Sequence, residues 1–381
     1  MRLYEFEASR LFARKGIPVP RNAVVTSPQE AREKAEEIGL PVMLKAQVLT
    51  GGRGLAGAVQ AAESLDQVER GTESLLGSSV RGLSVRQVMV VRKVNVAKEL
   101  YLGVTIDGYR GTPVAIVSSE GGVSVNQLVM EQPKSVVMKP VSISKGLRLA
   151  EAREMCLKVG MEGLEVTQVA SILSALYRVF ESYDCLVAEI NPLARTTQGK
   201  HLGLDAKVEI DDSSLYRHTD LNLDFEGRID NPRERKGREI GVTYVELDGD
   251  IGIIASGAGL GMASMDIIKQ QEMQPANFLE TGGGITAELL YNAMDLVMQK
   301  EGLRAVFINL YGGINPIHEG AQGIGKYMKE YNVSIPVVAK ALGNRQEETW
   351  KIFREHGVHV VTDISTEKAI EYLAGILERT A

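Results

Sequence analysis

The sequence predicts an α/β protein whose C-terminal third is built on a parallel β-sheet. Short apolar runs in this third alternate with helical patterns, and glycine clusters follow the first three runs. Uninterrupted apolar runs are typical of strands that a parallel sheet buries on both faces, so we expect helices to cover both faces. The predicted strands are 251–255, 276–279, 305–310, 335–341 and 358–362.

The glycine clusters mark the expected binding edge of this sheet, because ligands in such folds bind at the carboxyl ends of the strands. The third cluster, Gly312-Gly313-Ile314-Asn315-Pro316, joins an apolar strand to the start of a helical pattern. Free backbone N–H groups and the positive end of a helix dipole meet at such a junction. We therefore expect a cradle for a phosphate or a carboxylate there.

The N-terminal part follows a different pattern and carries a lysine in an unusual place. A helix after Ser27, which forms a capping box with Glu30, leads to the apolar strand 41–44, which carries Lys45. A buried lysine is costly unless it is paired, so a phosphate partner is one interpretation. The other is an edge-strand lysine whose amine reaches water.

A glycine-rich loop, 50–57, follows this strand. Glycine lets backbone N–H groups approach a phosphate closely, which favours nucleotide binding. The loop fits neither a P-loop nor the dinucleotide-binding fingerprint, so a flexible turn stays open as the alternative.

The runs 186–193 and 201–208 flank a short polar turn and predict a β-hairpin. Alternation places Glu189 and Asn191 on one face of its first strand. Pairing across the turn can bring Asn191 and Asp205 together as oxygen ligands of Mg²⁺. The alternative is the polar outer face of a half-exposed hairpin, which the apolar surroundings of Glu189 disfavour. The polar segment 211–239 is expected to be an irregular connection between domains.

Composition narrows the function classes. The chain has 381 residues, 44% of them apolar, and a net charge of −6, which argues against nucleic acid or an anionic membrane as a partner. Cys156 and Cys185 are too few for a disulfide framework or a cysteine zinc site. Apolar runs fall short of the about 20 residues of a membrane span, and the charged N-terminus is unlike a signal peptide. We expect a soluble cytoplasmic protein.

The sequence lacks an evident nucleophile for a covalent intermediate. It contains no G-x-S-x-G motif, and none of its histidines forms a pair at metal-ligand spacing with a carboxylate on a helix face. His318, in the helix predicted after Gly313, is the histidine of interest.

Taken in order, these motifs resemble the β subunit of the succinate–CoA ligase (succinyl-CoA synthetase) family, nearly from end to end. The matching motifs are 45–48, 51–54, 97–103, 120–123, 189–193, 205–207, 257–260, 275–279, 282–284 and 312–314. The resemblance implies an N-terminal ATP-grasp domain at 1–238, with two α+β subdomains at about 20–100 and 101–238. A flavodoxin-like, doubly wound parallel-sheet CoA-ligase domain would follow at 239–381.

The resemblance also implies roles for the matching residues. Those that would hold the nucleotide, ATP or GTP, are Lys45, Gly52, Arg53, Gly54 and Glu99. Those that would bind Mg²⁺ are Asn191 and Asp205, and Glu189 would act catalytically by orienting an incoming phosphohistidine. Those that would bind a small carboxylic acid are Ser256, Gly313, Ile314 and Asn315.

In this family, a phosphoryl group passes between nucleotide and acid through a phosphohistidine and an acyl phosphate, and CoA then displaces the phosphate. The histidine and the main CoA site belong to the α subunit. The resemblance therefore implies an obligatory α partner, in a heterodimer or a heterotetramer, and accounts for the missing nucleophile.

Several positions depart from the family pattern. Leu55 and Val91 replace a lysine and a glutamate on the nucleotide side, so ATP and GTP both stay open. Ser256 replaces an asparagine, and 315–318 replace Val-Arg-Cys-Asp on the acid side. Two alternatives follow: a ligase for an acid other than succinate, such as a bulkier or hydroxylated one, and a non-catalytic ATP-grasp partner subunit. The CoA-ligase-type domain argues against a carboxylate–amine ligase.

Overall fold

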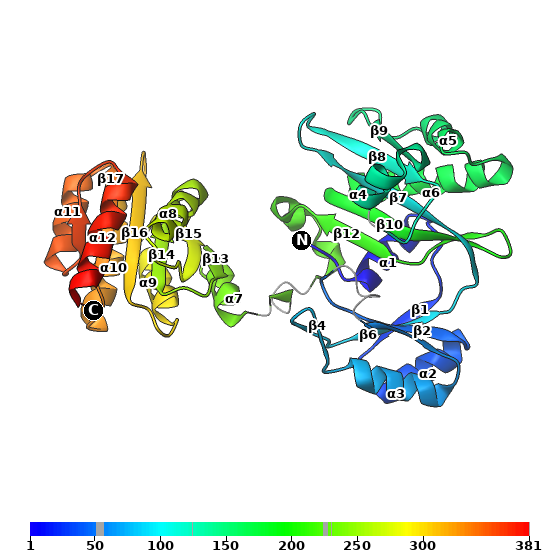
Figure 1. The fold of residues 1–381 in the computed structure, drawn as a ribbon, viewed down its shortest axis with the longest axis horizontal. Coiled ribbons are helices and arrows are strands. Elements are labelled where there is room, and N and C mark those ends of the chain that lie inside the picture. The colour runs from blue at the N-terminus through cyan, green and yellow to red at the C-terminus, as the bar shows by residue number, and fades with distance from the viewer. Residues whose placement is uncertain (51–56, 124, 224–227, 230, 381) are drawn as a thin grey trace. The chain divides into compact units, whose positions relative to one another are not determined.

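The computed structural model describes residues 1–50, 57–123, 125–223, 228–229 and 231–380. It divides into two compact units, Met1–Leu223 and Asp224–Ala381, of which the first has antiparallel sheets with helices and the second a largely parallel sheet with helices, as predicted (Figure 1). Within the described ranges, no helix is both long and apolar enough to cross a membrane.

The smaller sheet of the first unit is antiparallel and carries Lys45. Its strand order is β1 (Asn22–Val25), β6 (Val88–Arg92), β2 (Val42–Ala46) and β3 (Val59–Ala62). Helices α2 (Pro28–Ile38) and α3 (Leu65–Leu75) share its core, and the short strands β4 (Ser79–Val80) and β5 (Leu83–Ser84) follow α3. The Ser27 cap of the predicted capping box is confirmed, because the Glu30 N–H donates to Ser27 Oγ at 3.2 Å. The Glu30 carboxylate accepts from the Thr26 N–H at 2.9 Å, one residue before the cap.

The larger sheet of the first unit is also antiparallel. Its order is β11 (His201–Gly203), β10 (Cys185–Thr196), β7 (Val96–Asp107), β8 (Thr112–Ser118) and β9 (Val136–Pro140), with β12 (Ala206–Ile210) also paired to β10. The α-helices of this part are α1 (Glu5–Arg14), α4 (Val125–Glu131), α5 (Leu149–Lys158) and α6 (Gly163–Ser182). The 3₁₀ turns are η1 (Pro133–Ser135), η2 (Asp212–Arg217) and η3 (Thr219–Leu221).

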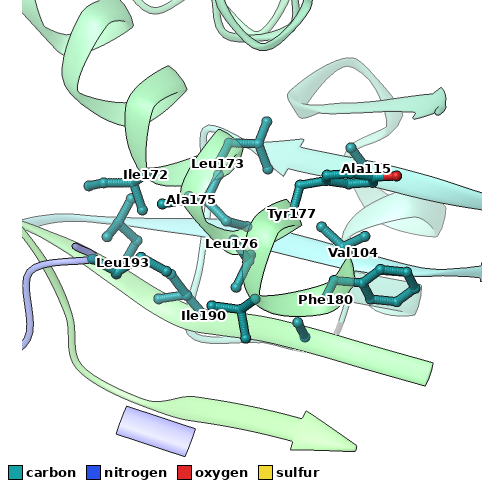
Figure 2. Close-up of a cluster of buried hydrophobic side chains, with 14 of the residues drawn as sticks. Val104, Ala115, Ile172, Leu173, Ala175, Leu176, Tyr177, Phe180, Ile190 and Leu193 are labelled. Atoms are coloured by element: carbon teal, nitrogen blue, oxygen red, sulfur yellow. The ribbon is translucent and has the colours of Figure 1, made fainter. Parts of the chain in front are cut away.

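Helix α6 packs its apolar face on the larger sheet (Figure 2). Leu173 and Leu176 of the helix are inaccessible to solvent, as are Ile190 and Leu193 of β10. Burial of one such side chain stabilises the fold by roughly 1.5–3 kcal/mol. The core therefore holds β10, the strand that carries Glu189 and Asn191, in a fixed position.

The second unit contains the predicted parallel sheet. Its order is β13 (Thr243–Glu246), β15 (Asn277–Glu280), β14 (Ile251–Ala255), β16 (Ala305–Gly312), β17 (Val337–Gly343) and β18 (His359–Val361). Its helices after β13 are α8 (Ala258–Gln270), α9 (Ala287–Met298), α10 (Ile317–Glu330), α11 (Gln346–Glu355) and α12 (Thr366–Thr380). The five parallel strands follow the flavodoxin-like order 2-1-3-4-5.

Helices cover both faces of this sheet, as the apolar runs predicted. Ile254 and Ile308 belong to a core that includes residues of α9 and α10. Their neighbours Ile253 and Phe307 belong to a second core that includes residues of α8 and α12. The edge strand β13 is antiparallel to β15, which the sequence pattern did not predict.

The prediction of irregular structure for 211–239 is wrong in part, because α7 (Pro232–Glu239) forms there. The Asn231 side chain caps this helix by accepting hydrogen bonds from the Arg233 and Glu234 N–H groups at 2.8 and 3.2 Å. Asparagine before a helix with proline at its first position is a strong start signal.

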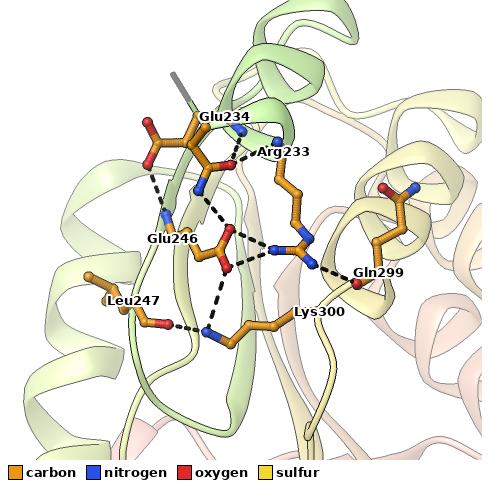
Figure 3. A network of polar contacts seen from close by, with 7 residues as sticks. Arg233, Glu234, Glu246, Leu247, Gln299 and Lys300 are labelled. Carbon is orange, nitrogen blue, oxygen red and sulfur yellow. Dashed lines mark hydrogen bonds and ion pairs between the residues drawn. The ribbon is translucent and has the colours of Figure 1, made fainter. Parts of the chain in front are cut away.

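A polar network anchors α7 to β13 (Figure 3). Arg233 Nη1 donates to both carboxylate oxygens of Glu246, at 2.7 and 2.8 Å, and Asn231 Nδ2 donates to one of them at 2.7 Å. Lys300 Nζ lies 4.0 Å from the same carboxylate. Partial burial alone would raise the pKa of Glu246, but the hydrogen bonds from Asn231 and Arg233 lower it. The ionised carboxylate therefore joins three segments of the unit.

Candidate active site

The predicted hairpin is confirmed, and it brings the two predicted magnesium ligands together. The C-terminal part of β10, residues 193–195, pairs with β11, and its N-terminal part, residues 185–190, pairs with β12. Between these two pairings, the Asn191 N–H donates to the Asp205 carbonyl at 3.3 Å. The side chain of Glu189 is 18% exposed and that of Lys207 opposite it is 46% exposed, so this face of the hairpin is partly accessible to solvent.

The side chain of Asn191 is held by the loop after β8. Its Oδ1 accepts a hydrogen bond from the Gly122 N–H at 2.8 Å, and its Nδ2 donates to the Val123 carbonyl at 2.9 Å. An amide oxygen has two lone pairs, so Oδ1 keeps one for a cation. Asp205 is the backbone partner of Asn191, and a carboxylate and an amide oxygen are hard donors of the kind that Mg²⁺ takes, together with phosphate oxygens and water. Within the described part of the chain, no group of three or more histidine, cysteine or acidic side chains is arranged to hold a metal ion.

Glu189 lies beside a cation and a buried phenol. Its Oε2 is 3.4 Å from Lys207 Nζ, the residue opposite it on β12. On its other side it faces Gly103 of β7, which the hydroxyl of Tyr101 overlies. Burial and the Glu189 carboxylate both raise the pKa of Tyr101, so this hydroxyl keeps its proton.

The side chain of Lys45 is 12% exposed, and two protein acceptors hold its ammonium group. Its Nζ donates to Glu5 Oε1 and to the Leu204 carbonyl, both at 2.7 Å. β2 lies between β6 and β3, so the alternative of an edge-strand lysine is wrong. Because Leu204 precedes Asp205, the ammonium group lies next to the segment that carries the Asn191–Asp205 pair. The sequence analysis did not identify Glu5 as a partner of Lys45. Glu5 lies in the first turn of α1, where acidic residues are common in any helix, so the sequence carries no signal for this role.

Glu99, on β7, lies beside Gly122, the residue whose N–H donates to Asn191. A Cβ atom at Gly122, whose φ is +79°, would lie 2.3 Å from Glu99 Oε2. A Cβ atom at Gly121 would lie 2.4 Å from the Leu100 carbonyl oxygen. The two glycines therefore let the loop pack directly on β7. The predicted nucleotide residues Gly52, Arg53 and Gly54 lie outside the described residues.

In the second unit, Ser256 follows β14 at the point where the strand order reverses. Its Oγ accepts a hydrogen bond from the Tyr311 N–H at 2.8 Å and donates to the Tyr311 carbonyl at 3.2 Å. The hydroxyl thus ties β14 to β16, and an interaction with an acid stays a prediction.

The glycine cradle lies at the same edge of the sheet. Asn344 holds it, because its N–H donates to the Gly312 carbonyl at 2.7 Å and its Nδ2 to the Ile314 carbonyl at 2.9 Å. Ile314 is 92% exposed, and Gly313 beside it is exposed as well. Asn315 Nδ2 would contact a Cβ atom at Gly283 at 3.5 Å, so two of the three glycine clusters meet here as predicted.

At this edge of the sheet His318 contacts Arg345, a partner that the sequence analysis did not predict. His318, in the first turn of α10, is 6% exposed, and its Nε2 lies 3.0 Å from Arg345 Nη1. A guanidinium group can only donate, so Nε2 accepts and the proton sits on Nδ1. Within the described residues, this buried Nδ1 has no hydrogen-bond partner. Arg345 also pairs with Glu348 at 2.5 Å.

Comparison with known proteins agrees with this division of the chain. The family model of the ATP-grasp domain matches residues 2–195, and that of the CoA-ligase matches residues 254–373. The GDP-forming succinate–CoA ligase β subunit of Thermus thermophilus is 39% identical, over 98% of this chain and 99% of that one. The ADP-forming β subunit of Roseiflexus sp. (strain RS-1) is 37% identical, over 97% and 99%.

Among solved structures, ATP citrate lyase from Methanothrix soehngenii, in complex with citrate and coenzyme A, superposes with a TM-score of 0.79. The match covers 98% of this chain and 99% of that one, at 18% identity, so it shows a shared fold.

Fold and site together define a protein in which an ATP-grasp domain is joined to a CoA-ligase domain. The chain belongs to the succinate–CoA ligase β-subunit family.

Proposed function

We propose that this chain is the β subunit of an acid–CoA ligase that forms a CoA thioester from a small carboxylic acid, CoA and ATP or GTP, with release of the nucleoside diphosphate and phosphate. One observation carries the nucleotide half of the proposal. A continuous set of contacts links all the described residues that the family resemblance assigns to that half. It runs from Lys45 through Leu204 to Asp205, on to Asn191, and from Asn191 to Glu189 and through Gly122 to Glu99.

The chemistry suits phosphoryl transfer, which depends on positioning and charge neutralisation. Asn191 and Asp205 would hold Mg²⁺, which when bound neutralises charge on the phosphate oxygens. Lys45 would add a fixed positive charge, and Glu189 would accept a hydrogen bond from the incoming histidine of the α subunit. The nucleotide stays ATP or GTP, since the relatives include ADP-forming and GDP-forming enzymes.

The acid would bind at the carboxyl edge of the second unit. Free N–H groups after β16 and the start of α10 favour a carboxylate or its acyl phosphate. Succinate is the first candidate for this acid, because the relatives of this chain are named succinate–CoA ligases. A different acid is the second, because Ser256 is engaged with Tyr311 and His318 with Arg345, and these positions depart from the family pattern.

The test is an acid screen on the complex of this chain with its α subunit. Succinate, malate, citrate and other small acids are each incubated with CoA, Mg²⁺ and either ATP or GTP, and CoA thioesters are measured by mass spectrometry. We expect a thioester from one acid class, and much less of it at the same Mg²⁺ concentration when Asp205→Ala replaces the native chain. Formation of the α–β complex without a thioester from any acid would overturn the enzymatic proposal in favour of a non-catalytic subunit.

A further inference from the structure

The first turn of α1 reaches across the first unit to the predicted nucleotide site. Leu3, Ala8 and Phe12 around Glu5 belong to the core of the larger sheet, whereas Leu44, next to Lys45, belongs to the core of the smaller sheet. The Glu5–Lys45 ion pair therefore joins two separately packed layers. Its side chains are 3% and 12% exposed, and its Oε1–Nζ distance is 2.7 Å.

Two fixed acceptors determine where the ammonium group of Lys45 points. An ammonium group has three N–H donors in tetrahedral arrangement. Glu5 Oε1 and the Leu204 carbonyl take two of them, which leaves one donor with its direction set by the other two. A lysine side chain has four rotatable bonds and loses considerable entropy when it is immobilised, so holding it in place beforehand favours binding.

Neighbouring contacts hold the same end of α1 against the same strand. The Phe6 N–H donates to Gln47 Oε1 at 3.2 Å, and Gln47 Nε2 donates back to the Lys45 carbonyl at 3.1 Å. Arg2 Nη1 donates to the Leu49 carbonyl at 3.1 Å. The backbone on the C-terminal side of Lys45 is thus fixed to the segment that carries Glu5.

We propose that Glu5 is a positioning residue for phosphoryl transfer, which holds the Lys45 ammonium group so that its remaining donor meets a phosphate oxygen of the nucleotide. This inference rests on the proposed nucleotide role of Lys45. Glu5 acts through Lys45 and touches neither the nucleotide nor the acid. A carboxylate that competed with the phosphate for Lys45 would have the opposite effect, because its removal would tighten nucleotide binding.

The test is a double-mutant cycle on the complex of the full chain with its α subunit, read as the dissociation constant of Mg²⁺–ADP by calorimetry. The variants are Glu5→Gln, Lys45→Met and both together. We expect Lys45→Met to weaken binding about tenfold or more, as for loss of a charge-assisted hydrogen bond. Glu5→Gln should weaken it about threefold or more, and the double variant should bind no more weakly than Lys45→Met, because the two residues act as one unit.

The outcomes separate this inference from the proposed function. Unchanged affinity in Lys45→Met would contradict the nucleotide role of Lys45. Weakened affinity in Lys45→Met, with unchanged or tighter binding in Glu5→Gln, would overturn the inference about Glu5 alone. The same holds if the fold-change in the dissociation constant of the double variant equals the product of the fold-changes of the two single variants. The double variant leaves no lone buried charge, so it keeps the cycle readable if Lys45→Met unfolds. In that case Glu5→Gln and the double variant decide, since positioning predicts weaker binding in both.

A control ion pair is available just beyond the ends of β3 and β6 of the same sheet. Lys93 Nζ and Glu63 Oε1 form an ion pair of similar length, 2.8 Å, with side chains 34% and 65% exposed. Glu63→Gln should leave the affinity for Mg²⁺–ADP unchanged. An equal loss of affinity in Glu63→Gln would assign the effect of Glu5→Gln to general loosening of the smaller sheet.

Discussion

The main-chain N–H of Asn191 donates to the carbonyl of Asp205 at 3.3 Å, which fixes these residues opposite each other where β10 passes from β12 to β11. The hydrogen bond belongs to the backbone, so the pairing persists when either side chain is changed. The side chains can therefore be removed one at a time without loss of the hairpin.

Asp205→Ala and Asn191→Ala should each raise the Mg²⁺ concentration needed for half-maximal activity by about tenfold or more, because each removes an oxygen donor from a small ligand set. The measurement is the reaction rate as a function of Mg²⁺ at saturating nucleotide. Asp107→Ala, at the last residue of β7, serves as the control and should behave like the native chain. An unchanged Mg²⁺ requirement in both site variants would place the cation elsewhere.

Gly122→Ala should weaken nucleotide binding severalfold, since the new Cβ atom would lie 2.3 Å from Glu99 Oε2 and must displace that carboxylate. Gly111→Ala is a matched control, because Gly111 also has a positive φ, +63°, but has no heavy atom within 4 Å of the added Cβ. Both variants carry the strain of a left-handed backbone, of order 1 kcal/mol. Equal nucleotide affinities in the two variants would remove Glu99 from the site.

Ser256→Ala should raise the KM for the acid about fivefold and leave the KM for the nucleotide unchanged. The hydroxyl bridges both polar groups of Tyr311, and one hydrogen bond is worth about 1 kcal/mol. Steady-state kinetics with each substrate varied in turn provide the measurement. A change confined to the nucleotide KM would argue against an acid site at this edge.

Both cysteines should resist thiol reagents in the folded protein. Burial raises the pKa of the Cys156 and Cys185 thiols to about 12, so the reactive thiolate is scarce at pH 8. Ellman's reagent should modify both residues only at the rate of unfolding, and rapidly in denaturant. Fast stoichiometric labelling of the native chain would contradict this burial.

Local sequence patterns predicted much of the fold. The alternation of apolar runs and helical patterns in 251–362 predicted the parallel sheet, and its glycine clusters do lie at one edge. The hairpin pattern placed Asn191 next to Asp205. These predictions succeeded because strand periodicity and turn chemistry depend on residues that are near one another in the chain.

The features that sequence reasoning missed depend on distant parts of the chain. Lys45 binds the carboxylate of Glu5 and the carbonyl of Leu204, and His318 meets Arg345. No local pattern specifies such partners, because the sheet order and the packing of the helices bring them together. The antiparallel edge strand β13 was missed for a similar reason, since its partner β15 lies beyond β14 in the chain.

The central claim is that this chain, with its α subunit, transfers a phosphoryl group from a nucleoside triphosphate to a histidine of that subunit. The most direct measurement incubates the purified complex with Mg²⁺ and γ-labelled ATP or GTP, without acid or CoA. We expect acid-labile label on a histidine of the α subunit, lost when succinate or the preferred acid is added with CoA, and strongly reduced with Asp205→Ala at the same Mg²⁺ concentration. An intact complex whose α subunit stays unlabelled with both nucleotides would contradict it.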